Sequence, residues 1–118
     1  MITRRLMIAL MGLSLGAFLA PQIALAAGTH IEQAIEETQA AIQEGSKPHH
    51  SASLVEHADN AIDHAKMAQK EQANPHIKSG ILHLRKAIKT AKYTHSSRRL
   101  ALAVKHAEKA LVDFQAVQ

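Results

Sequence analysis

Histidine is the residue type best suited to chemistry in this chain, and it recurs at a fixed spacing. The sequence has 118 residues, nine histidines, no cysteine and no tryptophan. Four histidines open a block of the form His-x-x-x-Ala-aliphatic, namely His30, His57, His83 and His106. A block that recurs along a chain indicates a repeated structural unit, and here each unit carries an imidazole at the same place.

Imidazole predicts binding of borderline transition metals. Neutral imidazole suits copper(II), nickel and zinc, with carboxylates as harder partners. Positions seven apart on a helix are about 10.5 Å apart along its axis, so they are too distant to share one ion. The chelating spacing His-x-x-x-His is absent. A site with several ligands must therefore draw on two helices, a connector or water, and we expect several weak to moderate sites rather than one closed site.

A seven-residue frame arranges these residues in four columns. The columns are His30, Glu37 and Glu44; His50, His57 and His64; His76, His83 and Thr90; and Arg99, His106 and Asp113. Two further histidines lie off the frame, in connectors. The candidate metal ligands are His30, Glu37, His49, His50, His57, His64, His76, His83, His95 and His106. A flanking histidine is often only a solvated side chain, and repeat duplication could preserve such residues without function.

Four amphipathic helices are expected to position the columns, at about 29–44, 53–72, 75–92 and from 97 onward. Thr29 is a candidate N-cap, the run from Ser53 to Glu56 resembles a capping box, Asn74 and Pro75 form a strong start signal, and Ser96 or Ser97 can cap the last helix. No stretch alternates with period two. The pattern predicts an all-α, antiparallel up-down-up-down four-helix bundle, with two helical hairpins that close only as a dimer as the alternative.

Antiparallel packing would turn the columns into layers, with the histidines beside the apolar stripes rather than in the core. We expect one end to gather His30, His64, His76 and Asp113. The middle would hold Glu37, His57, His83 and His106. The other end would hold Glu44, His50, Thr90 and Arg99, with His49 and His95 nearby.

The first 26 residues have the composition of a secretory signal peptide. Arg4 and Arg5 precede an apolar run that ends at Pro21, and Ala24-Leu25-Ala26 is a cleavage site of the A-x-A type. The apolar run is shorter than the roughly 20 residues that a spanning helix needs, which disfavours an uncleaved anchor. We therefore expect a signal peptide at 1–26, a metal-binding domain at 27–118, export to the periplasm and no stable membrane insertion after cleavage.

Charge divides the expected domain into two halves. Residues 27–73 hold three lysines and eight carboxylates, whereas residues 74–118 hold nine basic and two acidic side chains. The first two helices should attract cations and the last two should repel them. This ranks His49, His50, His57 and His64 highest, with Glu37 as a partner from the neighbouring helix. Simple complementarity between the two halves explains the asymmetry equally well.

The expected domain resembles a family, the small periplasmic metal-binding proteins. The segments that carry the resemblance are His57-Ala58-Asp59-Asn60-Ala61-Ile62, Asn74-Pro75-His76-Ile77 with His83, and Lys105-His106-Ala107-Glu108-Lys109-Ala110. The resemblance implies a histidine-rich four-helix bundle that binds several copper or other divalent ions and buffers or scavenges them. The chain departs from the family pattern where other residues occupy the histidine frame: Glu37, Glu44, Thr90, Arg99 and Asp113.

Other classes of function have less support in the sequence. No nucleophile–base grouping, phosphate loop or haem motif predicts an enzyme. The lack of aromatic stacking platforms disfavours binding to single-stranded nucleic acid. The alternative is an amphipathic helical interaction protein that uses the basic face of the last two helices to meet an anionic surface or partner. In either case we expect the protein to be a monomer.

Overall fold

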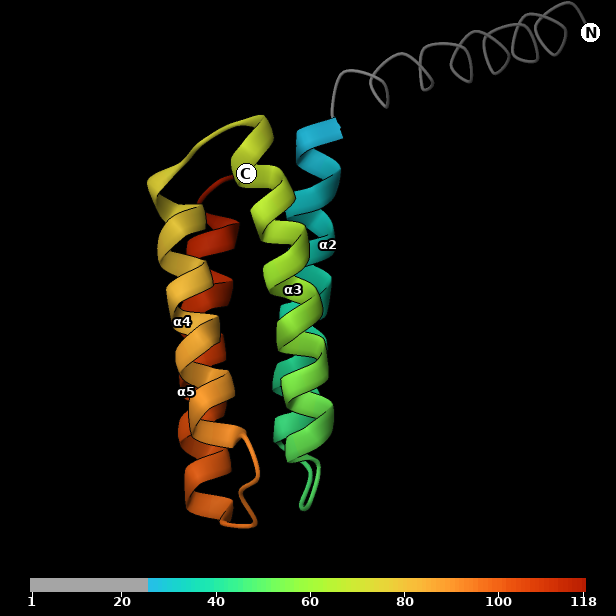
Figure 1. Cartoon of the computed structure of the whole chain (residues 1–118), viewed down its shortest axis with the longest axis vertical. Coiled ribbons are helices and arrows are strands. Elements are labelled where there is room, and N and C mark those ends of the chain that lie inside the picture. The colour runs from blue at the N-terminus through green and yellow to red at the C-terminus, as the bar shows by residue number, and fades with distance from the viewer. Residues whose placement is uncertain (1–25) are drawn as a thin grey trace, which may run out of the picture.

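The computed structural model describes residues 26–118, with side chains from Thr29 onward, and this part of the chain holds four helices and no strand (Figure 1). The helices are α2 (Ala26–Gly45), α3 (Ser51–Glu71), α4 (Pro75–Ala91) and α5 (Ser97–Gln115). The predicted all-α class is confirmed. The predicted signal peptide, residues 1–26, lies outside the described residues except for Ala26, and its cleavage stays a prediction.

The helices pack as two pairs, α2 with α3 and α4 with α5, and the pairs face one another. The main contacts between helices also join α3 to α4 and α2 to α5, so each helix has two principal neighbours. Figure 1 shows the three connectors at alternating ends of the molecule, and the C-terminus lies at the same end as the connector between α3 and α4. No helix among the described residues is both long and apolar enough to cross a membrane.

Two of the predicted helix starts are confirmed. The Asn74 side chain accepts a hydrogen bond from the backbone N–H of His76, and Pro75 occupies the first turn of α4. The Ser96 side chain accepts a hydrogen bond from the backbone N–H of Arg99 at the start of α5. Both side chains satisfy a backbone donor that the helix itself leaves without a partner.

The other two predicted starts are wrong. The described part of α2 begins at Ala26, so Thr29 lies inside the helix. Helix α3 begins at Ser51 with His50 as its N-cap residue, and His50 makes no side-chain capping hydrogen bond. Ser53 is already helical, and its hydroxyl donates to Glu44 Oε1 at 2.8 Å across the connector. The serine therefore joins α2 to α3 instead of closing a capping box.

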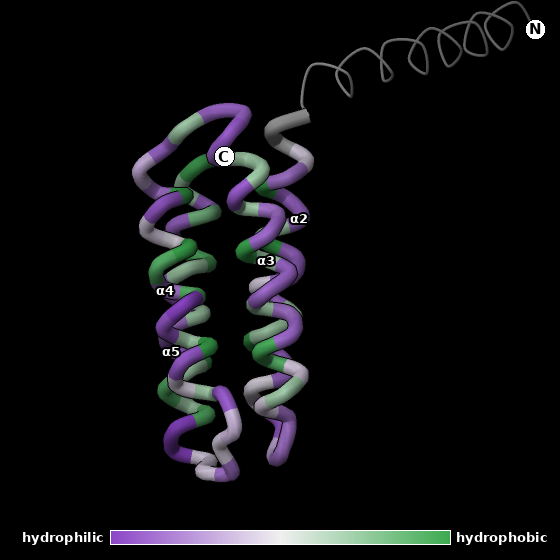
Figure 2. The backbone as a smooth tube through the Cα atoms, in the orientation of Figure 1, coloured by the Kyte–Doolittle hydropathy of each residue, from purple (hydrophilic) through white to green (hydrophobic). Residues whose placement is uncertain are grey.

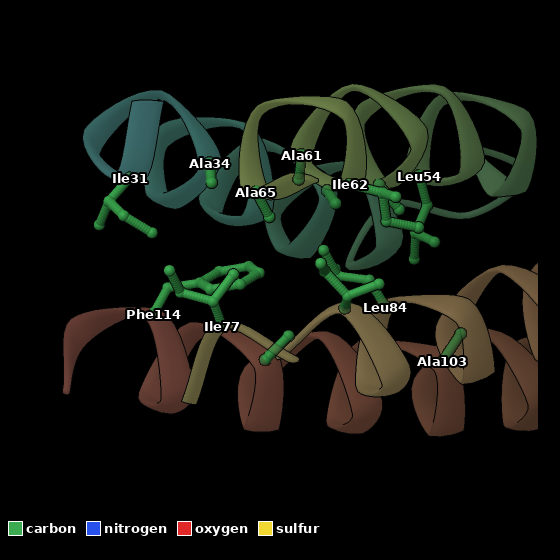
Figure 3. Packing of buried hydrophobic residues seen from close by; sticks show 14 of the residues in the cluster. Ile31, Ala34, Leu54, Ala61, Ile62, Ala65, Ile77, Leu84, Ala103 and Phe114 are labelled. Carbon is green, nitrogen blue, oxygen red and sulfur yellow. The ribbon is translucent and has the colours of Figure 1, made fainter. Parts of the chain in front are cut away.

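The core between the two helix pairs consists mostly of alanine. Eleven of the 19 buried hydrophobic residues are alanines, and the larger side chains such as Leu54, Ile77, Leu84 and Phe114 fill the space between them (Figure 3). Hydrophobic and hydrophilic residues alternate along every helix, as expected for faces that are half buried (Figure 2). Small side chains let the helices approach closely, and the histidines remain outside this core.

Two glycines mark places where helices come together. A methyl group at Gly80 would meet the ring of Phe114, with Cδ1 and Cζ both 2.8 Å away. A methyl group at Gly45 would collide with side-chain atoms of Leu54 and Val104. Gly45 is thus a packing residue at the end of α2, and the left-handed residue of that connector is His49, with φ of 66°.

Candidate metal centre

The frame histidines lie on the flanks of the helices, as the sequence predicts. Their rings are neither in the core nor all fully in solvent. Five of the seven are half buried, namely His30, His57, His64, His83 and His106, whereas His50 and His76 are exposed, as are the two connector histidines His49 and His95. A ring on a flank can reach across the groove to the neighbouring helix, and several of them do.

The closest contact of this kind joins α2 to α3. His57 Nδ1 lies 2.7 Å from Glu37 Oε2, and both side chains are about one-third exposed or less. The sequence predicts this pairing, because Glu37 and His57 occupy the same layer. The contact is confirmed, and it supplies a nitrogen and an oxygen donor from two different helices.

The same groove holds a second group at the end where α2 begins and α3 ends. His30 Nε2 lies 3.2 Å from Glu71 Oε1, and the rings of His30 and His64 are stacked with their centroids 6.3 Å apart. The candidate ligands predicted from the sequence include His30 beside His64 but not Glu71. The frame itself could have identified Glu71, because it lies seven residues after His64 on the same helix.

At the opposite end of the groove, Glu44 is surrounded by donors. Lys47 Nζ lies 2.7 Å from its carboxylate, Ser53 donates to it at 2.8 Å, and His50 Nδ1 is 3.5 Å away. Hydrogen bonds from Lys47 and then Ser53, with a smaller effect from His50, lower the pKa of Glu44 to about 2. The carboxylate therefore stays ionised over the whole physiological range.

The groove between α4 and α5 is organised around Asp113. Its two carboxylate oxygens lie 3.6 Å from His76 Nδ1 and 3.7 Å from His83 Nε2. The two histidines are two turns apart on α4, so one carboxylate from α5 lies between them. The predicted layer groups Asp113 with His30, His64 and His76, so the contact with His76 lies within that layer and the contact with His83 lies outside it.

Further along this groove, the electrostatic environment disfavours a charged ring. Burial lowers the pKa of His106, and the positive charges of Lys109, Lys86 and His83 act in the same direction. Seven residues beyond His83 the frame position is Thr90, and seven residues before His106 it is Arg99, so this level of the frame contributes no imidazole. The basic half of the molecule therefore presents fewer donor pairs than the acidic half.

The four residues of a predicted layer do not converge on one point; they form contacts two by two, within each helical hairpin. His57 meets Glu37 within one hairpin, and His83 lies near His106 within the other. Among residues 29–118 no group of three or more His, Asp or Glu side chains is arranged to hold a metal ion. The donors fit a transition metal in type, because they are imidazoles with carboxylates beside them, but each position offers only part of a coordination shell.

Four buried imidazole nitrogens have no hydrogen-bond partner within the described part of the chain. They are the buried Nδ1 atoms of His30, His64, His83 and His106, and each helix contributes one. Buried polar atoms normally make a hydrogen bond, so these four are exceptions that need an explanation.

The two histidines off the frame lie at one end of the bundle, as predicted. His49 and His95 line a pocket of about 560 Å³ between the two connectors. Residues of α5, among them Leu100 and Val104, also line this pocket, and so do the basic side chains Lys47 and Lys105. Glu108 is the acidic side chain of this lining, and no hydrogen bond or ion pair holds either histidine ring within the described residues.

Comparison with known proteins identifies one family. A family model described as small metal-binding protein matches residues 3–117, which is nearly the whole chain. No curated protein matches the chain.

Proposed function

The chain belongs to the small metal-binding protein family, and we propose on that premise that it is a non-catalytic periplasmic protein that binds and buffers divalent transition metals, copper(II) first. The candidate ligands are the frame and connector histidines together with Glu37, and nickel and zinc are further cargo. The family supports metal binding. The choice of metal, the compartment and the buffering role are our proposal.

The pairing of His57 with Glu37 across α2 and α3 is the observation that best supports it. Donor pairs of this kind recur along the groove at seven-residue intervals, so ions would bind separately and with partial shells completed by water. Such incomplete sites favour reversible binding. A structural metal site, by contrast, has a closed set of four protein ligands and contributes to folding. Reversible, repeated binding is the property that a buffer needs.

Donor chemistry supports copper(II) over copper(I). Copper(I) prefers thiolate and thioether ligands, and residues 27–118 contain no cysteine and only Met67 as a thioether. Met67 lies half exposed on α3. Imidazole and carboxylate are the ligands that remain, and copper(II) heads the affinity order for such donors.

The proposed compartment and topology rest on two further observations. The composition of residues 1–26 is that of a signal peptide, and its removal would release the helical domain. Connectors at alternating ends support an antiparallel up-down-up-down order (Figure 1). A domain of this kind, monomeric and without a membrane anchor, could meet ions freely in the periplasm.

Equilibrium dialysis against copper(II) at about pH 7.5 tests the proposal, because imidazole is mostly neutral there. We expect several bound ions per chain and weaker capture below about pH 6.5, since protons compete for the ligand nitrogens. A variant with His50, His57 and His64 replaced by alanine should keep its helical circular dichroism and bind fewer ions. A parent protein that binds no copper would refute the proposal.

The basic face of α4 and α5 remains a second candidate for function. All nine lysine and arginine side chains of residues 74–118 are exposed, and none forms an ion pair within the described part of the chain. An unbalanced basic surface can bind anionic lipid. Pelleting of the metal-free protein with anionic vesicles, but not with neutral ones, would support this second function.

A further inference from the structure

The histidine rings in this structure are held in two opposite ways. In one group a carboxylate lies beside Nδ1, as at His57 with Glu37, and at longer distance at His50 with Glu44 and His76 with Asp113. In the other group Nδ1 is buried without a partner among the described residues, as at His30, His64, His83 and His106. The difference decides which ring nitrogen carries the proton.

A neutral imidazole has one N–H and one lone pair, and its surroundings choose between the two nitrogens. At His57 the carboxylate of Glu37 can only accept, so the 2.7 Å contact requires the proton on Nδ1. The lone pair is then on Nε2. This is the tautomer that binds a metal through Nε2, with the carboxylate holding the ring from behind.

The second group favours the other tautomer. A proton on a buried Nδ1 without a partner would leave an N–H donor unsatisfied, which is unfavourable. The proton therefore resides on Nε2, and at His30 this N–H can donate to Glu71 at 3.2 Å. To bind a metal at Nε2, such a ring must first move its proton to the buried nitrogen.

We propose that Glu37 is a positioning residue that holds His57 in the tautomer ready to bind metal through Nε2, whereas His30, His64, His83 and His106 rest in the opposite tautomer. This inference rests on the proposed function and deepens it. His57 has the shortest carboxylate contact of its group, so it is the ring best prepared to bind metal. The inference also changes the role of Glu37, which is otherwise a candidate oxygen ligand of the ion, both from the sequence and under the proposed function.

Nitrogen NMR of the purified, metal-free protein tests the proposal directly, at a pH where the rings are neutral. The protonated and unprotonated nitrogens of an imidazole have well-separated ¹⁵N shifts. We expect a protonated Nδ1 at His57 and a protonated Nε2 at the four rings with a buried Nδ1. A His57 ring protonated at Nε2 would overturn the proposal, and so would the same tautomer in all five rings.

Substitutions of Glu37 separate a positioning role from direct ligation. Glu37→Gln keeps an oxygen that accepts from Nδ1, so it should preserve the His57 tautomer and most of the copper affinity at that ring. Glu37→Ala removes the acceptor and should weaken binding there about 10- to 100-fold, the usual effect of losing such a support. Equal losses in both variants would show that Glu37 binds the ion itself, which contradicts the proposal.

The matched control is Glu36→Ala, which removes the same charge from the adjacent, exposed position. It should leave both the His57 tautomer and copper affinity unchanged, and a loss equal to that of Glu37→Ala would overturn the proposal in favour of a general charge effect. Far-ultraviolet circular dichroism checks that each variant is folded. Copper binding with the wrong tautomer at His57 would refute this inference alone, whereas the expected tautomers without any copper binding would refute the proposed function alone.

Discussion

At the scale of single residues, the frame predicts height along the bundle better than it predicts partners. It places Glu37 beside His57 and His30 beside His64, and both contacts are present. It could not predict which ring nitrogen faces the partner, because that depends on rotamers and on the handedness of the bundle. The unpartnered Nδ1 atoms of the described residues are therefore a finding of the structure alone.

Glu44 provides a pH-dependent prediction at this scale. Its pKa is about 2 in the folded protein against an ordinary value of 4.5, so folding favours its ionised form. The stabilisation that follows is complete above about pH 4.5 and is lost as the pH falls toward 2. We expect Glu44→Gln to be less stable than the parent at neutral pH and to approach the parent's stability in acid.

Urea denaturation at a series of pH values measures this convergence. Glu36→Gln is the control, since Glu36 is an exposed glutamate on the same helix with no ion pair among the described contacts. A difference between the parent and Glu44→Gln that does not change with pH would contradict the assigned hydrogen bonds.

At the scale of helices, local rules succeed where a side chain serves only its own helix. Asn74 and Ser96 each cap the helix that follows them. Ser53 fails as a cap because Glu44, from the preceding helix, accepts its hydrogen bond. A tertiary contact of this sort has no local sequence pattern, so the start of α3 could not be predicted as well as the start of α4.

Gly80 provides the prediction for this scale. Alanine is the better helix former by about 1 kcal/mol, but overpacking a filled core costs about 1–3 kcal/mol. The Phe114 ring is fully buried, and two of its atoms lie only 2.8 Å from the place that a methyl group on residue 80 would occupy. We therefore expect Gly80→Ala to lower the free energy of unfolding.

Thermal denaturation followed by circular dichroism measures the effect. Gly45→Ala is the matched variant, because its methyl group would meet the ends of the Leu54 and Val104 side chains. These can move more readily than a buried ring, so the loss should be smaller. A Gly80→Ala protein more stable than the parent would contradict the packing described for α4 and α5.

At the scale of the whole molecule, the two helix pairs differ in charge and in the number of histidine–carboxylate contacts that they offer to a cation. The acidic pair α2 and α3 carries donor contacts at three levels of its groove, whereas the basic pair ends in Thr90 and Arg99. The sequence predicts this asymmetry from charge and spacing. It could not predict that, in the described part of the chain, side chains of one layer contact each other only within a hairpin. That outcome depends on which helices are neighbours and how far apart they lie, and the sequence of a single helix specifies neither.

The asymmetry predicts unequal losses of metal capacity. Replacing His50, His57 and His64 by alanine should reduce copper binding more than replacing His76, His83 and His106 on α4 and α5. The local negative potential favours the first group, and added salt should narrow the difference because it screens such fields. Parallel dialysis of the two triple variants at low and high salt makes the comparison, and equal losses at low salt would contradict it.

The alanine interior has a consequence for how such a protein can change over time. Since the small side chains that hold the helices together and the rings on the flanks occupy separate positions, one set can vary while the other stays constant. Related proteins could gain a histidine at frame positions such as Thr90 and Arg99, or lose one elsewhere in the frame, without any change in core packing. The number of ions bound per chain could then change by surface substitutions alone, while the packing of the helices stays the same.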